Sequence, residues 1–325
     1  MNLSIDAQRL HEELAQMAAI SGAAGPDVRQ DAVGNAFARR VGSQPELAAV
    51  AVSGPGGLEA IRALRDAGHR PRRSVELIRF TAAAGAARFG IGCLGSRLLS
   101  GAMPAWKAAR LSGEDGKTFD EWRAEAGFEG PLESAALAPG HYAAFLELQI
   151  EPGGPPLRIV TSFAASAGLR VTVEGEGAED ALGEIAQEVR NASMGAGAVD
   201  CVASGVTSRF RLEINVADPG QAKRDQMVSQ IACACRDTAQ RRRIAVKAEV
   251  LHMDPAVECG AEVVDALARA AGKHSLGYQR MASRGCHHAQ FLSRIAPAGT
   301  LLVPSPAEAA SGALVLAEAL AELAG

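Results

Sequence analysis

The stretch Leu146-Glu147-Leu148-Gln149-Ile150-Glu151-Pro152-Gly153 alternates apolar and polar residues and then ends in a Pro-Gly turn signal. Alternation with a period of two is typical of a β-strand, because successive side chains of a strand point to opposite faces. A strand here places Glu147, Gln149 and Glu151 on one face, with Leu148 and Ile150 opposite. The polar face is either the remnant of a polar cleft or a solvated surface.

The segments before this strand predict a parallel sheet. Residues 31–40 carry a turn and a strand, and residues 48–53 form a short apolar strand that ends in Gly54-Pro55-Gly56-Gly57. A helix follows over residues 58–68, and residues 75–80 read as the next strand. A β-α-β unit of this kind favours parallel strands in an α/β domain.

A different pattern, β-α-β-β-α-β, begins after residue 161. It comprises a strand at 169–174, a helix at 178–191, strands at 199–206 and 209–216, a helix at 221–241 and a strand at 244–251. This order is the split β-α-β arrangement, which is sufficient for a small domain. Helices at 263–271 and 309–323 and a strand at 300–303 then complete the first domain. We expect a two-domain α/β protein in which residues 1–162 and 254–325 form the larger domain, with a mostly parallel sheet, and residues 163–253 form the smaller one.

The composition excludes several classes of protein. The chain has 325 residues, 48% of them hydrophobic, which fits a globular protein with a substantial core. A net charge of −4 gives no sign of a nucleic-acid surface. No apolar run reaches the roughly 18 residues of a membrane span, and the first residues do not resemble a signal peptide. We therefore expect no membrane association and a cytoplasmic location. The six cysteines form no zinc or disulfide framework by their spacing.

Several short strings, in this order, resemble one family of enzymes. They are Asp31-Ala-Val-Gly-Asn35 with Phe37-Ala-Arg-Arg40, Gly95-Ser96, the 146–153 segment, Leu169 to Gly175, and Val303-Pro304-Ser305 with Pro306-Ala307-Glu308. The chain is similar to the zinc-dependent amidase/carbamoylase branch of the M20 peptidases, which includes N-carbamoyl-L-amino-acid hydrolase, β-ureidopropionase and allantoate amidohydrolase. The resemblance covers nearly the whole chain and implies a catalytic α/β domain with an inserted lid or dimerisation domain.

The resemblance also implies a two-metal centre with five ligands, and this chain departs from it at each ligand segment. The loop with the first ligands is missing between Ser53 and Gly57. Ala83 and Ala84 stand where the family has Glu-Glu, and Gln149 stands where it has a metal-binding His. The last His-containing segment is absent after residue 305. Alanine and a neutral amide are poor ligands for a divalent transition metal. We therefore expect the family's Zn, Mn or Ni site to be lost and no cofactor to be bound.

The densest group of functional side chains that remains is Arg284-Gly285-Cys286-His287-His288. The family has Gly-His-Asp-Ala there, so His287 matches its substrate-contacting His and His288 replaces the Asp. Two imidazoles and a thiol can support acid/base or nucleophilic chemistry. Our catalytic candidates are therefore Cys286, His287 and His288. The ligand-binding candidates are His287, Arg284, Gln149 and Asn215, the last of which falls near the position of a substrate-binding Arg.

Three functions follow as hypotheses. The first is a catalytically degenerate homologue that serves as a non-catalytic subunit, bound to an intact paralogue or to itself through the small domain. The second is an enzyme, either a hydrolase of C–N bonds in ureido or carbamoyl amino acids and amides, or a metal-independent enzyme that uses Cys286, His287 and His288. The third is a metal-free protein that binds a small ureido or amide ligand. A Gly90-x-Gly92-x-x-Gly95 match lacks the strand that a dinucleotide site requires immediately before it, so we do not expect dinucleotide binding.

Overall fold

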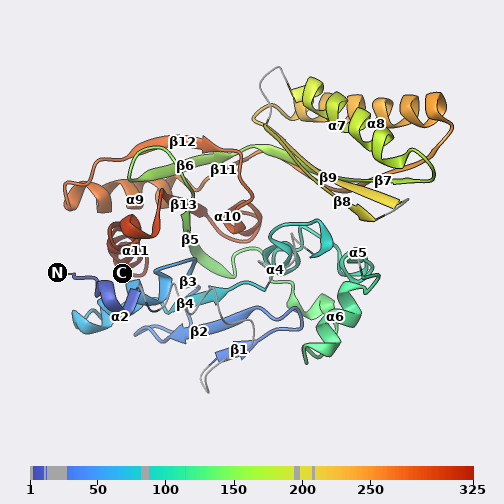
Figure 1. Cartoon of the computed structure of the whole chain (residues 1–325). Coiled ribbons are helices and arrows are strands. Elements are labelled where there is room, and N and C mark those ends of the chain that lie inside the picture. Colours follow the sequence, from blue (N-terminus) through green and yellow to red (C-terminus); the bar gives the residue numbers. More distant parts are fainter. Residues whose placement is uncertain are drawn as a thin grey trace. The chain divides into compact units, whose positions relative to one another are not determined.

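A computed structural model of the chain describes residues 3–10, 12, 28–81, 88–113, 115–193, 198–206 and 209–325 (Figure 1). The positions Ala83 and Ala84 lie outside these ranges. The chain divides into two compact units. The larger unit contains residues 1–161, 258–281 and 286–325, and the smaller unit contains residues 162–257 and 282–285.

The larger unit is built on a nine-stranded mixed sheet with a parallel centre. Its strand order is β1-β2-β4-β3-β5-β13-β6-β11, and β12 also pairs with β6. The four central strands, β4, β3, β5 and β13, are parallel, whereas β2 and β6 join this centre antiparallel. The predicted mostly parallel sheet of the larger domain is confirmed. The strands are β1 Val28–Gln30, β2 Ala36–Arg40, β3 Ala49–Ser53, β4 Val75–Arg79, β5 Tyr142–Ile150, β6 Arg158–Phe163, β11 Val257–Glu258, β12 Gln279–Ser283 and β13 Ala298–Val303.

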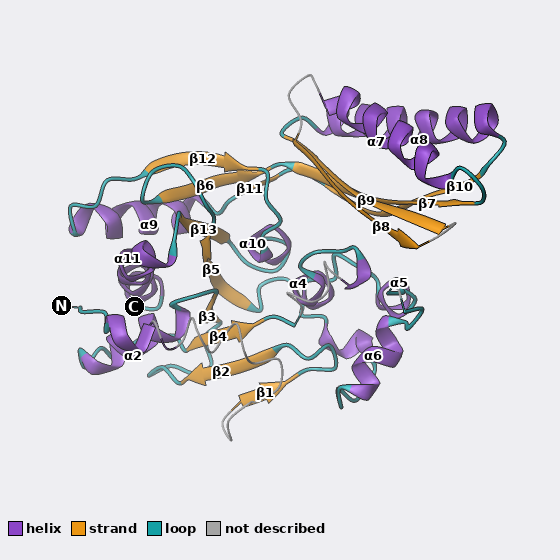
Figure 2. Cartoon of the chain, in the orientation of Figure 1, coloured by secondary structure: helices purple, strands orange, loops and turns teal. Residues whose placement is uncertain are grey.

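Helices cover both faces of the central strands (Figure 2). The helices α2 (Gly57–Asp66), α9 (Ala261–Lys273) and α11 (Ala309–Leu323) pack on the face that carries the apolar side chains of β3 and β5, and together they form the main core. The helices α4 (Leu94–Leu99) and α10 (His288–Leu292) contact each other, and α10 also contacts β5 and β13. The remaining short elements are α5 Ala105–Ala109, α6 Phe119–Glu125, η1 Leu132–Ala135 and η2 Pro306–Glu308.

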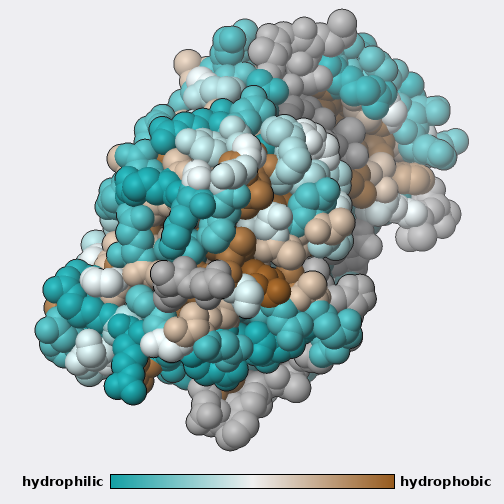
Figure 3. Space-filling model, turned by 90° about the vertical axis from the view of Figure 1, so that its left-hand side faces the viewer, coloured by the Kyte–Doolittle hydropathy of each residue, from teal (hydrophilic) through white to brown (hydrophobic). Residues whose placement is uncertain are grey.

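The surface over α2, α9 and α11 is mainly hydrophilic, and its hydrophobic residues are exposed in a limited central area (Figure 3). This agrees with helices that bury one apolar stripe against the sheet and present polar side chains to water. Within the ranges that the structure describes, no helix combines the length and apolar character needed to cross a membrane.

The smaller unit is an antiparallel four-stranded sheet with two helices. Its elements are β7 Ala165–Glu174, α7 Ala178–Ser193, β8 Ala198–Val206, β9 Arg209–Asp218, α8 Gln221–Arg242 and β10 Ala245–Asp254. The strand order β10-β7-β9-β8 is the split β-α-β arrangement, so this prediction is confirmed. Alternate residues of β7 and β9, such as Leu169, Val171 and Ile214, pack with Ile185 of α7 and Ile231 of α8.

One buried amide ties three segments of the larger unit together. Asn35, which is fully buried, follows the turn between β1 and β2. Its Oδ1 accepts a hydrogen bond from the backbone N–H of Thr81 at 2.9 Å, just after β4. Its Nδ2 donates to Asp31 Oδ2 at 2.8 Å and to the carbonyl of Gly95 at 3.3 Å, in the first turn of α4. The amide therefore sets where α4 begins relative to the end of β4.

This contact leaves no room for a side chain at residue 95. A Cβ on Gly95 would lie 2.2 Å from Asn35 Oδ1 and 2.9 Å from the carbonyl oxygen of Thr81. We predict that Gly95→Ala lowers the free energy of unfolding by about 1–3 kcal/mol, because the substitution displaces a buried hydrogen-bonded amide. The measurement is chemical unfolding followed by circular dichroism.

The control is Gly272→Ala in α9, where a Cβ would meet nothing within 4 Å. This variant should be neutral or up to about 1 kcal/mol more stable, because alanine favours a helix over glycine. Equal stability of the two variants would show that the Asn35 contact does not constrain α4.

Candidate functional site

A row of buried polar residues crosses the centre of the larger sheet. Glu147 of β5 is in register with Ser53 of β3 on one side and with Thr300 of β13 on the other. All three are at most 1% exposed. Residues in register on neighbouring strands point to the same face, which here is the face opposite Leu146 and Leu148. Polar groups at the centre of a buried sheet are costly unless they are paired, so each needs a partner or a function.

Glu147 is held by four hydrogen-bond donors. Its Oε1 accepts from the backbone N–H of His288 at 3.3 Å and from Nε2 of Gln149 at 2.5 Å. Its Oε2 accepts from the backbone N–H of Ala289 at 2.9 Å and from Oγ1 of Thr300 at 3.2 Å. The buried carboxylate therefore fastens the first turn of α10 onto the sheet. Of the two alternatives for this polar face, a solvated surface is wrong for Glu147.

The two histidines stand at the start of α10. His287 occupies the cap position with an extended backbone and is 1% exposed, and burial lowers the pKa of its imidazole. His288 is half-buried and stacks on the ring of Phe80, with 4.2 Å between the ring centroids. Burial also lowers the pKa of His288. Both imidazoles are therefore neutral at pH 7.

The hydrogen bonds around Ser96 determine which nitrogen of His288 carries the proton. Ser96 Oγ lies 3.0 Å from the carbonyl oxygen of Cys93 and 2.9 Å from Nδ1 of His288. A hydroxyl has one proton to donate, and the carbonyl can only accept. Both bonds are formed when Ser96 donates to Cys93 and His288 donates its Nδ1–H to Ser96. In this tautomer Nε2 of His288 carries the lone pair and is the basic nitrogen.

Two thiols adjoin the histidines. The Sγ atoms of Cys93, which caps α4, and Cys286 are 3.0 Å apart. Cys93 is buried, whereas Cys286 is exposed. The hydrogen bond with Cys286 and burial raise the pKa of the Cys93 thiol well above its usual range, so Cys93 stays protonated at pH 7.

The structure brings together some of the residues predicted from sequence. Cys286, His287, His288 and Gln149 all belong to the larger unit, and Gln149 contacts the same carboxylate as the start of α10. Arg284 and Asn215 belong to the smaller unit, where both are exposed. Their role as ligand-binding residues stays a prediction.

Four residues of this region were missed as candidates: Ser53, Cys93, Ser96 and Thr300. Ser53 and Thr300 could have been found from the sequence. Each is a hydroxyl residue in a strand that is otherwise apolar, AVAVS for Ser53 and AGTLLV for Thr300. Ser53 Oγ is buried without a hydrogen-bond partner among the described residues. Cys93 and Ser96 gave no comparable signal, since their importance comes from contacts with residues almost 200 positions away.

The described residues do not fit the two-metal centre that the resemblance implies. They contain no group of three or more His, Cys, Asp or Glu side chains arranged to hold a metal ion. Glu147 already accepts four hydrogen bonds, and Gln149, at the position of an expected His, offers its amide N–H₂ to Glu147. The segment at 82–87 contains only alanine and glycine, so its sequence offers no side-chain ligand. We therefore derive no catalytic step through a metal.

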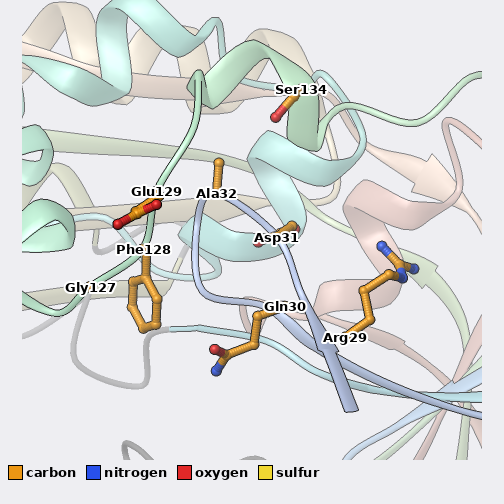
Figure 4. Close-up of a pocket in the computed structure, with 8 residues that line it drawn as sticks. All are labelled: Arg29, Gln30, Asp31, Ala32, Gly127, Phe128, Glu129 and Ser134. Carbon is orange, nitrogen blue, oxygen red and sulfur yellow. The ribbon is translucent and has the colours of Figure 1, made fainter. Parts of the chain in front are cut away.

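A second region of interest is a cavity of about 480 Å³ beside β1 (Figure 4). Its lining residues are Arg29, Gln30, Asp31, Ala32, Gly127, Phe128, Glu129 and Ser134. Asp31 is used by the turn, since Oδ1 accepts from the backbone N–H groups of Val33 and Asn35. The guanidinium of Arg29 lies 3.9 Å from the ring centroid of Phe37. Because these two side chains already have structural partners and no histidine or cysteine lines the cavity, we assign it no chemistry.

Comparisons with known proteins agree with this architecture. No family model matches the chain. Ureidoglycolate hydrolase of Arabidopsis thaliana is 32% identical over 368 residues, which cover 92% of this chain and 77% of the relative. N-carbamoyl-L-amino-acid amidohydrolase of Paenarthrobacter aurescens is 28% identical over 335 residues, which cover 88% of this chain and 81% of the relative.

A solved structure gives the same result for the fold. The crystal structure of AtUAH in complex with (S)-hydroxyglycine matches with a TM-score of 0.88 and 28% identity, covering 99% of this chain and 98% of that one. The similarity in sequence and in fold thus extends over both units. The chain belongs to the hydantoinase/carbamoylase family of M20-like amidohydrolases.

Proposed function

We propose that this protein acts on the C–N bonds of ureido or carbamoyl-substituted small acids, or of related amides, without a resident metal pair. The class of compound is suggested by the names of its relatives, which are hydrolases of ureidoglycolate and of N-carbamoyl-L-amino acids. The observation that carries the proposal is His288, a neutral imidazole whose ring is fixed by Ser96 and Phe80. This reverses our expectation of a pseudoenzyme, which the relatives do not support.

His288 has the properties of a general base. Its lowered pKa keeps the imidazole unprotonated at neutral pH, and the hydrogen bond from Nδ1 to Ser96 leaves Nε2 as the acceptor. In the proposed reaction Nε2 removes a proton from a water molecule as the water attacks the carbonyl carbon. The imidazolium then returns the proton to the departing nitrogen as the C–N bond breaks. Ser96 and Phe80 act as positioning residues, because both contact the ring of His288.

Replacing the base tests this proposal. We predict that His288→Ala lowers the rate of ammonia release from N-carbamoyl amino acids or ureidoglycolate by about 10²–10⁴-fold, the usual contribution of a positioned base. The matched control is His141→Gln, at an exposed histidine of the same unit. Retention of full activity by a folded His288→Ala protein would remove His288 from the mechanism.

The pH dependence of turnover provides an independent check. A general base works in its deprotonated form, and the pKa of His288 lies below the ordinary value of 6.5. The rate should therefore fall on the acidic side, and the midpoint of this acidic limb should lie below pH 6.5. An acidic limb centred above pH 6.5 would mean that a different group is titrating.

A second candidate function is a non-catalytic subunit, as the sequence first suggested. Three observations favour it: Glu147 is committed to the start of α10, the described residues offer no metal-binding cluster, and the alignment with the Arabidopsis relative is 368 positions long against 325 residues here. The relative thus has residues in the matched region for which this chain has no counterpart. In this role the chain would bind an intact paralogue, or itself, and would take at most a small ureido or amide ligand.

The subunit hypothesis predicts the composition of the native complex. Native mass spectrometry of material from its own host should then show this chain with a metal-loaded paralogue, with no metal on this chain. The purified chain alone should release no ammonia from the same substrates. A homo-oligomer that is active without metal would reject this candidate and favour the first one. Stoichiometric metal on this chain would reject both, because each requires the family's metal site to be absent.

A further inference from the structure

Cys93 and Cys286 are a pair of thiols that neither proposed function uses. Their Sγ atoms are 3.0 Å apart although the residues are 193 positions apart in the sequence. A disulfide bond has an S–S length of about 2.05 Å, so the two sulfur atoms need to approach by only about 1 Å. Both residues belong to the larger unit, so the contact lies within a single compact body.

The backbone around the pair accommodates this contact. A Cβ at Gly92 would lie 3.0 Å from Sγ of Cys286, so the glycine leaves space for that thiol. Cys93 adopts a left-handed conformation with φ of 58° and ψ of 30°. This region is uncommon for residues other than glycine and is costly unless the surrounding structure maintains it. The conformation places the side chain of Cys93 against Cys286 at the start of α4.

The two thiols differ in their accessibility to solvent. This difference suits a reaction in which one thiol is oxidised first and the other then forms a disulfide with it. Cys286 is exposed and can meet an oxidant from solvent, whereas Cys93 is buried next to it. The hydrogen bond with Cys286 and burial raise the pKa of Cys93, and the exposed Cys286 is the thiol that an oxidant in solution meets first. An exposed thiol beside a second, resolving cysteine is the usual arrangement of a redox-sensitive pair.

We propose that Cys93 and Cys286 form a reversible disulfide when the protein meets a hydroperoxide. Sγ of Cys286 attacks the peroxide, the O–O bond breaks, and the products are a sulfenic acid and water when the peroxide is H₂O₂. Sγ of Cys93 then attacks the sulfenic sulfur, forming the S–S bond and releasing a second water. The two thiols lose two electrons and two hydrogens in total, and the peroxide is reduced. A dithiol reductant restores both thiols by exchange.

The disulfide would restrain the backbone immediately before His287 and His288. The chain passes from the smaller unit to the larger one between Gly285 and Cys286, and His287 and His288 follow immediately. A covalent link from Cys286 to Cys93 would hold the residue that precedes His287, and with it the first turn of α10, against the start of α4 within the larger unit. The inference does not depend on either proposed function, because it concerns only the two thiols.

The test uses the full-length protein at low concentration, treated with H₂O₂ and then, after the oxidant is removed and the protein is denatured, with an alkylating agent. The chain has six cysteines. Alkylatable thiols should fall from six to four, and non-reducing peptide mapping should show one cross-linked peptide that joins Cys93 to Cys286, with two hydrogens lost. Dithiothreitol should restore all six thiols. The oxidised protein should also resist chemical unfolding better than the reduced protein, because the bond closes a long loop.

Matched variants make the test specific. Cys286→Ser should block the cross-link; this residue is exposed, so the variant should fold even if Cys93→Ser does not. Cys233→Ser, at an exposed thiol of α8, should still lose two thiols on oxidation. Six unchanged thiols, over-oxidation of Cys286 without a cross-link, or cross-links between two molecules would each overturn the proposal.

Discussion

The buried carboxylate of Glu147 is the interaction on which the rest of the site depends. Because it lies at the centre of a parallel sheet with 1% exposure, it requires donors from every side. The donors come from β5 itself, from β13 and from the first two residues of α10. This requirement fixes α10 against the sheet and so determines where His287 and His288 stand. Ser96 and Phe80 contact the ring of His288 because Glu147 holds the first turn of α10 beside them.

The same carboxylate also gives the side chain at position 149 a structural partner within the strand. A histidine at position 149 would offer a ring nitrogen to a metal ion. Gln149 instead has an amide N–H₂ group, and it donates to Glu147. The side chain therefore satisfies an internal acceptor where the family has a metal ligand. Burial lowers the pKa values of the two nearby imidazoles, His287 and His288, and a lowered pKa suits proton acceptance near neutral pH.

The fold was predictable from sequence to the extent that its elements carry a periodic pattern. The helix expected at 309–323 has these bounds in the structure, and the small domain's β-α-β-β-α-β order follows the expected sequence. Such elements depend on local apolar spacing, which one sequence displays. The cluster at 286–288 could be proposed from sequence because three functional side chains are consecutive there, and its role stays a prediction. Ser96 and Cys93 escaped notice because their partners are His288 and Cys286, and only the folded chain brings these segments together.

Membership of an amidohydrolase family and the chemistry of this particular chain are separate questions. The core of the larger unit is built from buried aliphatic side chains such as Val50, Leu146 and Leu301, and such a core specifies a fold without specifying a reaction. Catalysis requires specific groups at specific atoms, so it must be argued from the site itself. Here the site has a buried acidic residue, an oriented imidazole and a pair of thiols, one exposed and one buried, at one sheet face and two helix starts. Imidazoles can accept protons and paired thiols can exchange electrons, so the chemistry proposed for this chain is placed on these groups.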